Sequence, residues 1–103
     1  MSKILVKRRT RLELIAGCLF VCDQAAEGVM PSDMAFRMKL SWNRFRFVTN
    51  LMVQEGLITK DEKGRCFITE KGRLFLGTFK ELLNIINTTP DVYLKEQEVE
   101  ASG

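Results

Sequence analysis

Residues that start and stop helices divide this chain into short segments, and that division limits its possible folds more than any other sequence feature. Thr10 and Glu13 have the spacing of a capping box, in which each side chain accepts a hydrogen bond from the backbone of the other residue, so a helix should start near Arg11. A chain divided in this way must build its core from several short helices packed on one another. The other residues typical of helix starts are Ser32, Ser41 and Thr69, and those typical of helix ends are Gly28 and Gly56.

Apolar spacing predicts four helices. The first should end before Gly28, and a second, short helix should cover residues 33–38 with Ser32 as its N-cap. In the short helix, Met34 and Met38 lie four residues apart, so we expect both to be buried. Two longer helices are expected over residues 42–55 and 70–87, and the buried stripe of the first helix should hold Leu12, Ile15, Ala16, Leu19 and Cys22.

The segment between the last two helices has the pattern of a β-hairpin. Residues 57–60 and 65–68 are rich in β-branched and aromatic side chains, and the turn between them contains Gly64. Before this hairpin, the short helix, a tight connection at Lys39 and Leu40, and the longer third helix together resemble a helix-turn-helix.

Three stretches of the sequence resemble archaeal winged-helix regulators. Leu40–Ile58 is similar to their recognition helix and the Gly-Leu-Ile strand that follows it. Phe67–Arg73 resembles their junction between the wing and the last helix, and Arg8–Ile15 resembles their opening segment. The likeness covers about residues 7–80. It implies an α+β, mostly α, fold: a winged helix-turn-helix with three helices, a β-hairpin wing and a C-terminal dimerisation helix, which forms an antiparallel coiled coil in dimeric members of that group.

The charge is unevenly distributed over the four regions that we expect. These are a basic lead-in (1–9), a DNA-binding winged helix (10–69), a C-terminal helix for dimerisation (70–87) and an acidic, flexible tail (88–103). The formal net charge is +3, but the tail carries −3 and the rest of the chain carries +6. A basic body suggests a polyanionic partner, here double-stranded DNA.

The residue types present exclude much chemistry. Without a histidine, the chain cannot build a Ser-His or Cys-His nucleophile pair or an imidazole metal site. Its three cysteines are too few for an all-cysteine zinc site and cannot all pair within one chain, which favours reduced thiols. Cys18 and Cys22 lie four residues apart and could form a thiol sensor, but small buried hydrophobes are the commoner role of such residues.

No stretch has the apolar length of a signal peptide or a membrane helix. We therefore expect a cytoplasmic protein that is not an enzyme and needs no metal or cofactor. We also expect no membrane contact and find no pattern typical of a small-molecule site.

The third predicted helix separates into two faces at 100° per residue. Arg and Asn side chains pair bidentately with guanine and adenine edges, so we predict base contacts for Asn43, Arg46 and Asn50. Phe47 could contact a thymine methyl, a sugar or a partner protein, or pack against the lead-in, and Trp42 could support the helix or contact DNA. The alternative for the polar residues is an ordinary solvated surface. The core face should hold Phe45, Val48, Thr49 and Met52.

Cations on the hairpin and on the short helix could pair with phosphates, although hairpin tips are often charged for solubility alone. The lead-in cluster of Lys3, Lys7, Arg8, Arg9 and Arg11 could be a DNA-directed arm or only a solubilising segment. The complete set of predicted DNA-binding residues is Arg37, Lys39, Ser41, Trp42, Asn43, Arg44, Arg46, Phe47, Asn50, Lys60, Lys63 and Arg65.

The last helix has more apolar surface than packing on a small body requires, which favours a two-fold symmetric homodimer over simple packing. Its predicted interface residues are Phe75, Phe79, Leu82, Leu83 and Ile86, with Leu74 and Ile85 widening the surface. The leading function is a dimeric transcriptional regulator that places residues 42–55 in the major groove and residues 57–68 on the DNA backbone. The alternatives are a protein–protein interaction module of a transcription complex and a non-specific architectural chromatin protein.

Overall fold

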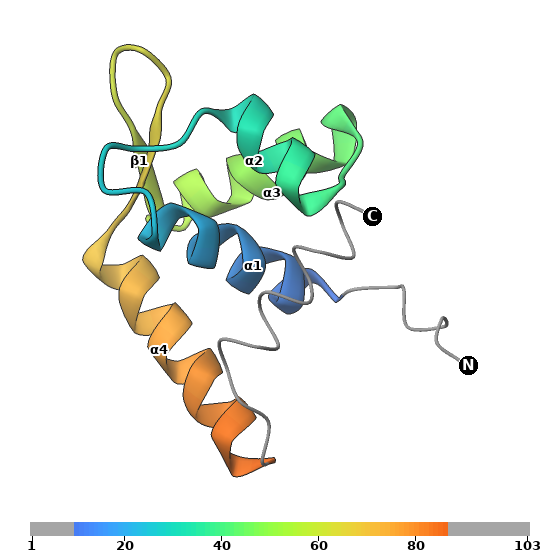
Figure 1. The fold of residues 1–103 in the computed structure, drawn as a ribbon, viewed down its shortest axis with the longest axis vertical. Helices are drawn as coiled ribbons and strands as arrows, with labels where there is room; N and C mark the ends of the chain where they lie inside the picture. The colour runs from blue at the N-terminus through green and yellow to red at the C-terminus, as the bar shows by residue number, and fades with distance from the viewer. Residues whose placement is uncertain (1–9, 87–103) are drawn as a thin grey trace.

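The computed structural model describes residues 10–86 and has the element order helix, helix, helix, hairpin, helix (Figure 1). The predicted lead-in and tail lie outside the described residues. The two strands are antiparallel, with Ile58 opposite Ile68 and Lys60 opposite Cys66. The helices are α1 (Arg11–Asp23), α2 (Pro31–Met38), α3 (Trp42–Gln54) and α4 (Glu70–Ile85), and the strands are β1 (Ile58–Lys60) and β2 (Cys66–Ile68).

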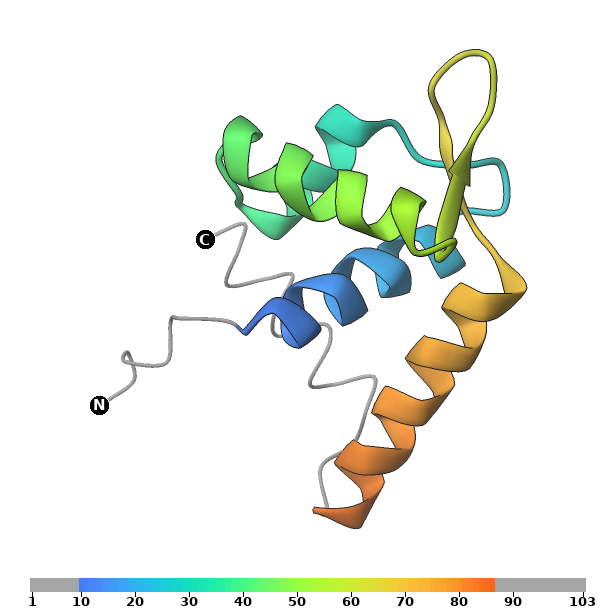
Figure 2. The ribbon, with the colours of Figure 1, turned by 180° about the vertical axis from the view of Figure 1, so that it is seen from behind.

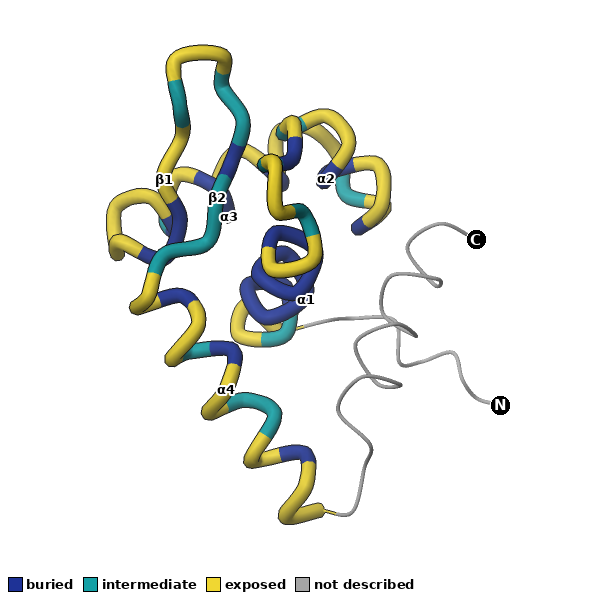
Figure 3. Tube along the Cα trace, turned by 60° about the vertical axis from the view of Figure 1, so that its left-hand side comes forward, coloured by how far each residue is buried: buried dark blue, intermediate teal, exposed yellow. Residues whose placement is uncertain are grey.

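α1 forms the centre of the core. It contacts α2, α3, α4 and β2, and the other helices surround it in Figures 1 and 2. All nine residues from Leu14 to Cys22 are buried, as the dark blue coil of α1 in Figure 3 shows. Ile15, Ala16, Leu19 and Cys22 of the predicted stripe are buried, but the residues between them are buried too, because a helix covered from every side buries all its faces. Leu12, which we placed in the stripe, is 58% exposed because it lies in the first turn, at the end of α1 away from the hairpin.

Three of the four predicted N-caps are confirmed. Thr10 and Glu13 form the reciprocal capping box, with N···O distances of 2.8 and 3.1 Å. The Ser41 hydroxyl accepts a hydrogen bond from the backbone N–H of Arg44 at 3.3 Å, and the Thr69 hydroxyl accepts one from Gly72 at 3.0 Å. These bonds satisfy backbone donors that the first turn of a helix leaves without a partner.

The predicted start of α2 is wrong. The helix begins at Pro31, so Ser32 lies inside it, and the N-cap position belongs to Met30, which makes no side-chain cap bond. Proline suits the first helical position because its φ is already helical and its missing N–H would have no partner there. Met34 and Met38 are buried, as predicted.

The connection from α2 to α3 is closed by a left-handed residue. Lys39 has φ 53° and ψ 46°, and its N–H donates to the carbonyl of Phe36 while that of Leu40 donates to Ala35. Hydrogen bonds of this kind end a helix and turn the chain sharply. The turn places α3 after α2 as the second helix of the helix-turn-helix.

The hairpin is attached to the body at two places. The backbones of Val29 and Cys66 exchange two hydrogen bonds, at 2.8 and 3.1 Å, which joins the segment before α2 to β2. At the base of the hairpin, the Thr69 hydroxyl lies within hydrogen-bond distance of the carbonyls of Gly56 and Leu57, at 2.6 and 3.0 Å. One side chain therefore ties the end of α3 to the start of α4.

Gly72 packs directly against this junction. A Cβ atom at Gly72 would overlap the carbonyl of Leu57 and lie 2.8 Å from the side chain of Ile68, whereas a Cβ at Gly77 would meet no atom within 4 Å. We therefore predict that Gly72→Ala lowers the free energy of unfolding by about 1–3 kcal/mol through overpacking.

The matched control is Gly77→Ala on the same helix, which should raise the free energy of unfolding by about 0.5–1 kcal/mol because alanine loses less backbone entropy. Urea denaturation followed by circular dichroism measures both changes. Equal effects of the two substitutions would contradict the close approach at Gly72.

Candidate nucleic-acid interface

α3 has a buried face and an exposed polar face, as the sequence predicted. The core side consists of Phe45, Val48, Thr49 and Met52, all of which are buried. The helix itself carries Arg44 and Arg46 and no acidic residue. Its exposed surface is therefore positively charged and rich in hydrogen-bond donors. The exposed predicted residues on or beside α3 are Ser41, Trp42, Asn43, Arg44, Arg46, Phe47 and Asn50.

The start of α3 is held by a cap and an aromatic contact. The Ser41 hydroxyl accepts the backbone hydrogen bond from Arg44, so its structural role is to cap the helix. Trp42 stacks on Phe45 with ring centroids 5.6 Å apart, yet it remains 51% exposed. Trp42 thus supports the core with one part of its ring system and presents the rest to solvent.

Phe47 lies beside α1 rather than alone on an outward surface. The guanidinium of Arg11 is 5.3 Å from the centre of the Phe47 ring, a cation–π distance, and Phe47 is 56% exposed. The sequence allowed packing of Phe47 against the lead-in as one alternative, but it placed Arg11 only in the basic cluster and did not pair these two residues. No local pattern connects the first turn of α1 with the middle of α3, because the two meet only in the folded protein.

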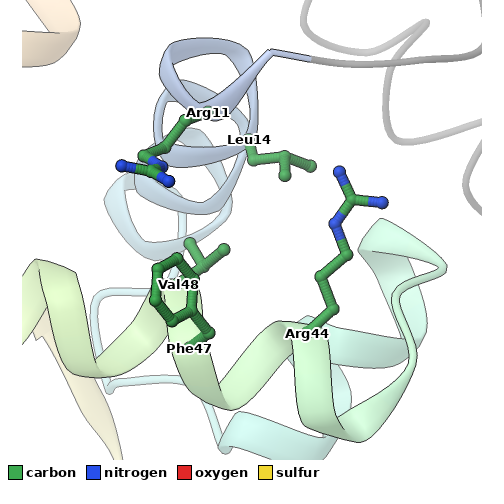
Figure 4. Close-up of a pocket in the computed structure, with 5 residues that line it drawn as sticks. All are labelled: Arg11, Leu14, Arg44, Phe47 and Val48. Atoms are coloured by element: carbon green, nitrogen blue, oxygen red, sulfur yellow. The ribbon is translucent and has the colours of Figure 1, made fainter.

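A pocket of about 210 Å³ opens between α1 and α3 (Figure 4). Arg11 and Leu14 reach into it from α1, while Arg44, Phe47 and Val48 come from α3. The sequence showed no pattern for such a pocket, because its lining combines residues of two helices that are distant in the chain. Two residues predicted to bind DNA, Arg44 and Phe47, therefore also line a cavity.

The tip of the hairpin is organised by Asp61. One carboxylate oxygen accepts hydrogen bonds from the backbone N–H groups of Lys63 and Arg65 at 2.9 and 2.8 Å, and the other accepts one from the Arg65 guanidinium at 3.0 Å. Desolvation of Asp61 acts to raise its pKa, but the hydrogen bonds from Arg65 and Lys63 outweigh it and lower the pKa below its usual value. Of the predicted phosphate contacts on the hairpin, Lys60 and Lys63 are exposed, whereas Arg65 is partly buried and paired with Asp61.

The other predicted cations lie on α2 and at its end. Arg37 is exposed in the last turn of α2, and Lys39 is exposed at the left-handed C-cap. Both positions precede α3 by only a few residues.

The three cysteines are buried core residues. Burial, with smaller contributions from Cys66 and Asp23, raises the pKa of the Cys22 thiol to about 12, and burial also raises that of Cys66. A thiol with a raised pKa carries little of the reactive thiolate at neutral pH, which argues against the thiol-sensor alternative. Residues 10–86 contain no group of three His, Cys, Asp or Glu side chains that could hold a metal ion.

On α4, the predicted interface residues do not share one environment. Phe75 and Phe79 are partly buried against the core, and Leu83 is buried, whereas Leu82 and Ile86 are exposed. Leu76, which is not among the predicted interface residues, is the residue of α4 that enters the main core. The exposed apolar side chains of α4 and of its C-cap residue are Leu74, Leu82, Ile85 and Ile86.

A family model described as winged helix-turn-helix matches residues 8–87, which is most of the chain. Together with four helices and a two-stranded antiparallel hairpin, this match shows that the chain belongs to the winged helix-turn-helix family. A search of curated proteins found no match. Among the described residues, no helix is long and apolar enough to cross a membrane.

The hydrogen bonds of Asp61 generate a prediction for the hairpin tip. Asp61→Ala should increase amide exchange at Lys63 and Arg65 by about two- to tenfold, since each amide loses one hydrogen bond of ordinary strength. Hydrogen exchange followed by NMR measures this, and Glu62→Ala, at the exposed neighbouring position, serves as the control.

In the wild-type protein, acid should cause the same increase in amide exchange at the hairpin tip. Folding lowers the pKa of Asp61. The stabilisation that its carboxylate gives to the hairpin tip is therefore complete above the unfolded-state pKa near 3.8 and is lost as the pH falls through the lower pKa of the folded state. If the amide of Lys63 lost its protection from exchange already at a pH above the unfolded-state pKa of Asp61, the role given to the Asp61 carboxylate would be contradicted.

Proposed function

We propose that this winged helix-turn-helix protein is a transcriptional regulator without enzymatic activity that binds duplex DNA with sequence selectivity. The observation that carries the proposal is α3: one face is buried, and the other presents arginine and asparagine side chains with no acidic residue along the helix. A major groove about 12 Å wide admits such a helix. In this arrangement Asn43, Arg46 and Asn50 contact base edges.

The hairpin supplies contacts to the DNA backbone that do not depend on the base sequence. Lys60 and Lys63 are exposed and pair with phosphates, which adds affinity for every duplex. Arg65 contributes less to this attraction, because its guanidinium already donates to Asp61. Arg37 and Lys39 extend the phosphate contacts toward the start of α3.

Dimerisation through α4 completes the proposal. Leu74 and Ile85 lie on the side of α4 away from its buried residues, with Leu82 at the edge of that side, and Ile85 is 75% exposed. Contact between two copies removes this apolar surface from water. A two-fold dimer then presents two α3 helices to half-sites about one helical turn apart.

The proposed base contact of Arg46 differs from the phosphate contact of Lys63 in a measurable way. Arg46→Ala should cost about 1–3 kcal/mol and relax the preference at one base position, whereas Lys63→Ala should weaken binding to all duplexes and reduce the salt slope by about one. Selection from a random duplex library followed by salt titrations measures both effects.

Lys71→Ala removes an exposed charge from α4 and serves as the control, which should leave binding unchanged. Equal affinity for all duplexes would replace the proposal with an architectural role. Undetectable or salt-insensitive DNA binding would overturn it in favour of a protein-interaction module, for which the exposed rings of Trp42 and Phe47 would then be the first contacts to test.

The dimer contact is tested separately by placing a charge on the exposed apolar side of α4. Ile85→Asp should raise the dissociation constant of the dimer at least about tenfold, because an unpaired carboxylate is costly to bury. Sedimentation velocity over a range of concentrations measures this constant.

Asn84→Asp introduces the same charge one residue away, at an exposed polar position, and should leave the dimer intact. A wild-type protein that sediments as a monomer at all concentrations would refute dimerisation without affecting the proposed contacts to DNA.

A further inference from the structure

The pocket between α1 and α3 combines an apolar floor with two cations. Leu14 and Val48 form the floor and are buried in the core, and the ring of Phe47 forms one wall (Figure 4). The guanidiniums of Arg11 and Arg44 stand on opposite sides of the opening. A ligand that fills this space therefore meets hydrocarbon below and positive charge at the rim.

Among the described residues, 10–86, the two arginines have no acidic partner. Arg65 pairs with Asp61 and Arg73 pairs with Asp23, and within residues 10–86 no such pair involves Arg11 or Arg44. Arg11 contacts the Phe47 ring, which is a weaker partner than a carboxylate and leaves its N–H donors available. Two guanidiniums beside one cavity attract an anion, and their planar fork matches the two oxygens of a carboxylate.

We propose that this pocket binds a small organic carboxylate whose apolar body packs on Leu14, Val48 and Phe47 while its carboxylate group pairs with Arg11 and Arg44. The apolar floor disfavours a bare inorganic anion, which would gain nothing from hydrocarbon contact. The volume of about 210 Å³ lies below the range of roughly 300–1,000 Å³ that is typical of pockets for larger ligands. The occupant is therefore about the size of a single aromatic ring with one carboxylate.

The position of the pocket gives its occupant a role in regulation, and this part of the inference rests on the proposed DNA binding. Arg44 and Phe47 belong to α3, and a bound carboxylate neutralises Arg44 and covers the Phe47 ring. Both side chains are then withdrawn from DNA, so the ligand lowers DNA affinity. Because coupling between two binding sites is reciprocal, DNA lowers the affinity for the ligand by the same factor.

Methyl NMR of the wild-type protein without DNA tests the pocket directly. Titration with benzoate should shift the methyl signals of Leu14 and Val48 saturably, whereas benzamide, its neutral analogue, and inorganic phosphate should bind at least about tenfold more weakly. Arg11→Gln and Arg44→Gln should each weaken benzoate binding about tenfold, the loss expected for one charged hydrogen-bonded contact. Unchanged methyl signals of the buried residues Met34 and Met38 show that the variants are folded.

Arg46→Gln is the matched control for this titration. It removes the same charge from the same helix but does not line the pocket, so benzoate affinity should stay within about twofold of wild type. The proposal is overturned by the absence of a saturable shift, by equal affinity for benzamide, or by unchanged binding in both pocket variants. Equal affinity for phosphate also overturns it and identifies the site as a contact for the DNA backbone.

A second titration separates this inference from the function on which its regulatory part rests. Benzoate should reduce DNA affinity in proportion to the occupancy measured by NMR. Saturable benzoate binding with unchanged DNA affinity refutes the coupling alone. A protein that binds benzoate but no DNA refutes the proposed function and leaves the pocket intact.

Discussion

The burial of α1 on every face is the constraint on which the rest of the structure depends. Nine consecutive residues, Leu14–Cys22, are withdrawn from water, so other elements must cover the helix from all sides. α2, α3, α4 and β2 provide that cover, and each contributes the apolar side of an otherwise polar element. The exposed side of α3 is consequently held in one orientation by the same packing that stabilises the core.

The attachment of the hairpin follows from this arrangement. β2 contacts α1, and the backbone bonds between Val29 and Cys66 fix the hairpin to the segment that precedes α2. Thr69 and Gly72 then position α4 where α3 and the hairpin meet. The cations of the hairpin tip thus project from a base that is fixed to the rest of the protein, while Asp61 orders the tip locally.

Local chemistry made most elements of this fold predictable, and tertiary contacts account for what was missed. The capping box at Thr10, the two faces of α3 and the glycine-containing hairpin follow from residues close together in the chain. The burial of Leu12 was wrongly predicted and that of Leu76 was not predicted, because burial depends on what covers a side chain, which helical periodicity does not specify. The contact of Arg11 with Phe47, and the pocket beside it, were out of reach for the same reason: their residues are joined only by the packing of α1 on α3.

Trp42 has a consequence for how this protein can be observed. It is the only tryptophan in the chain, and it stands at the first residue of α3, stacked on the buried ring of Phe45 and half open to solvent. Its indole is thus in contact with the core and with the surface at the same time. The fluorescence of this one tryptophan can therefore report unfolding, through loss of the Phe45 contact, and occupation of the α3 surface, through a change in solvent around the ring, without any attached label.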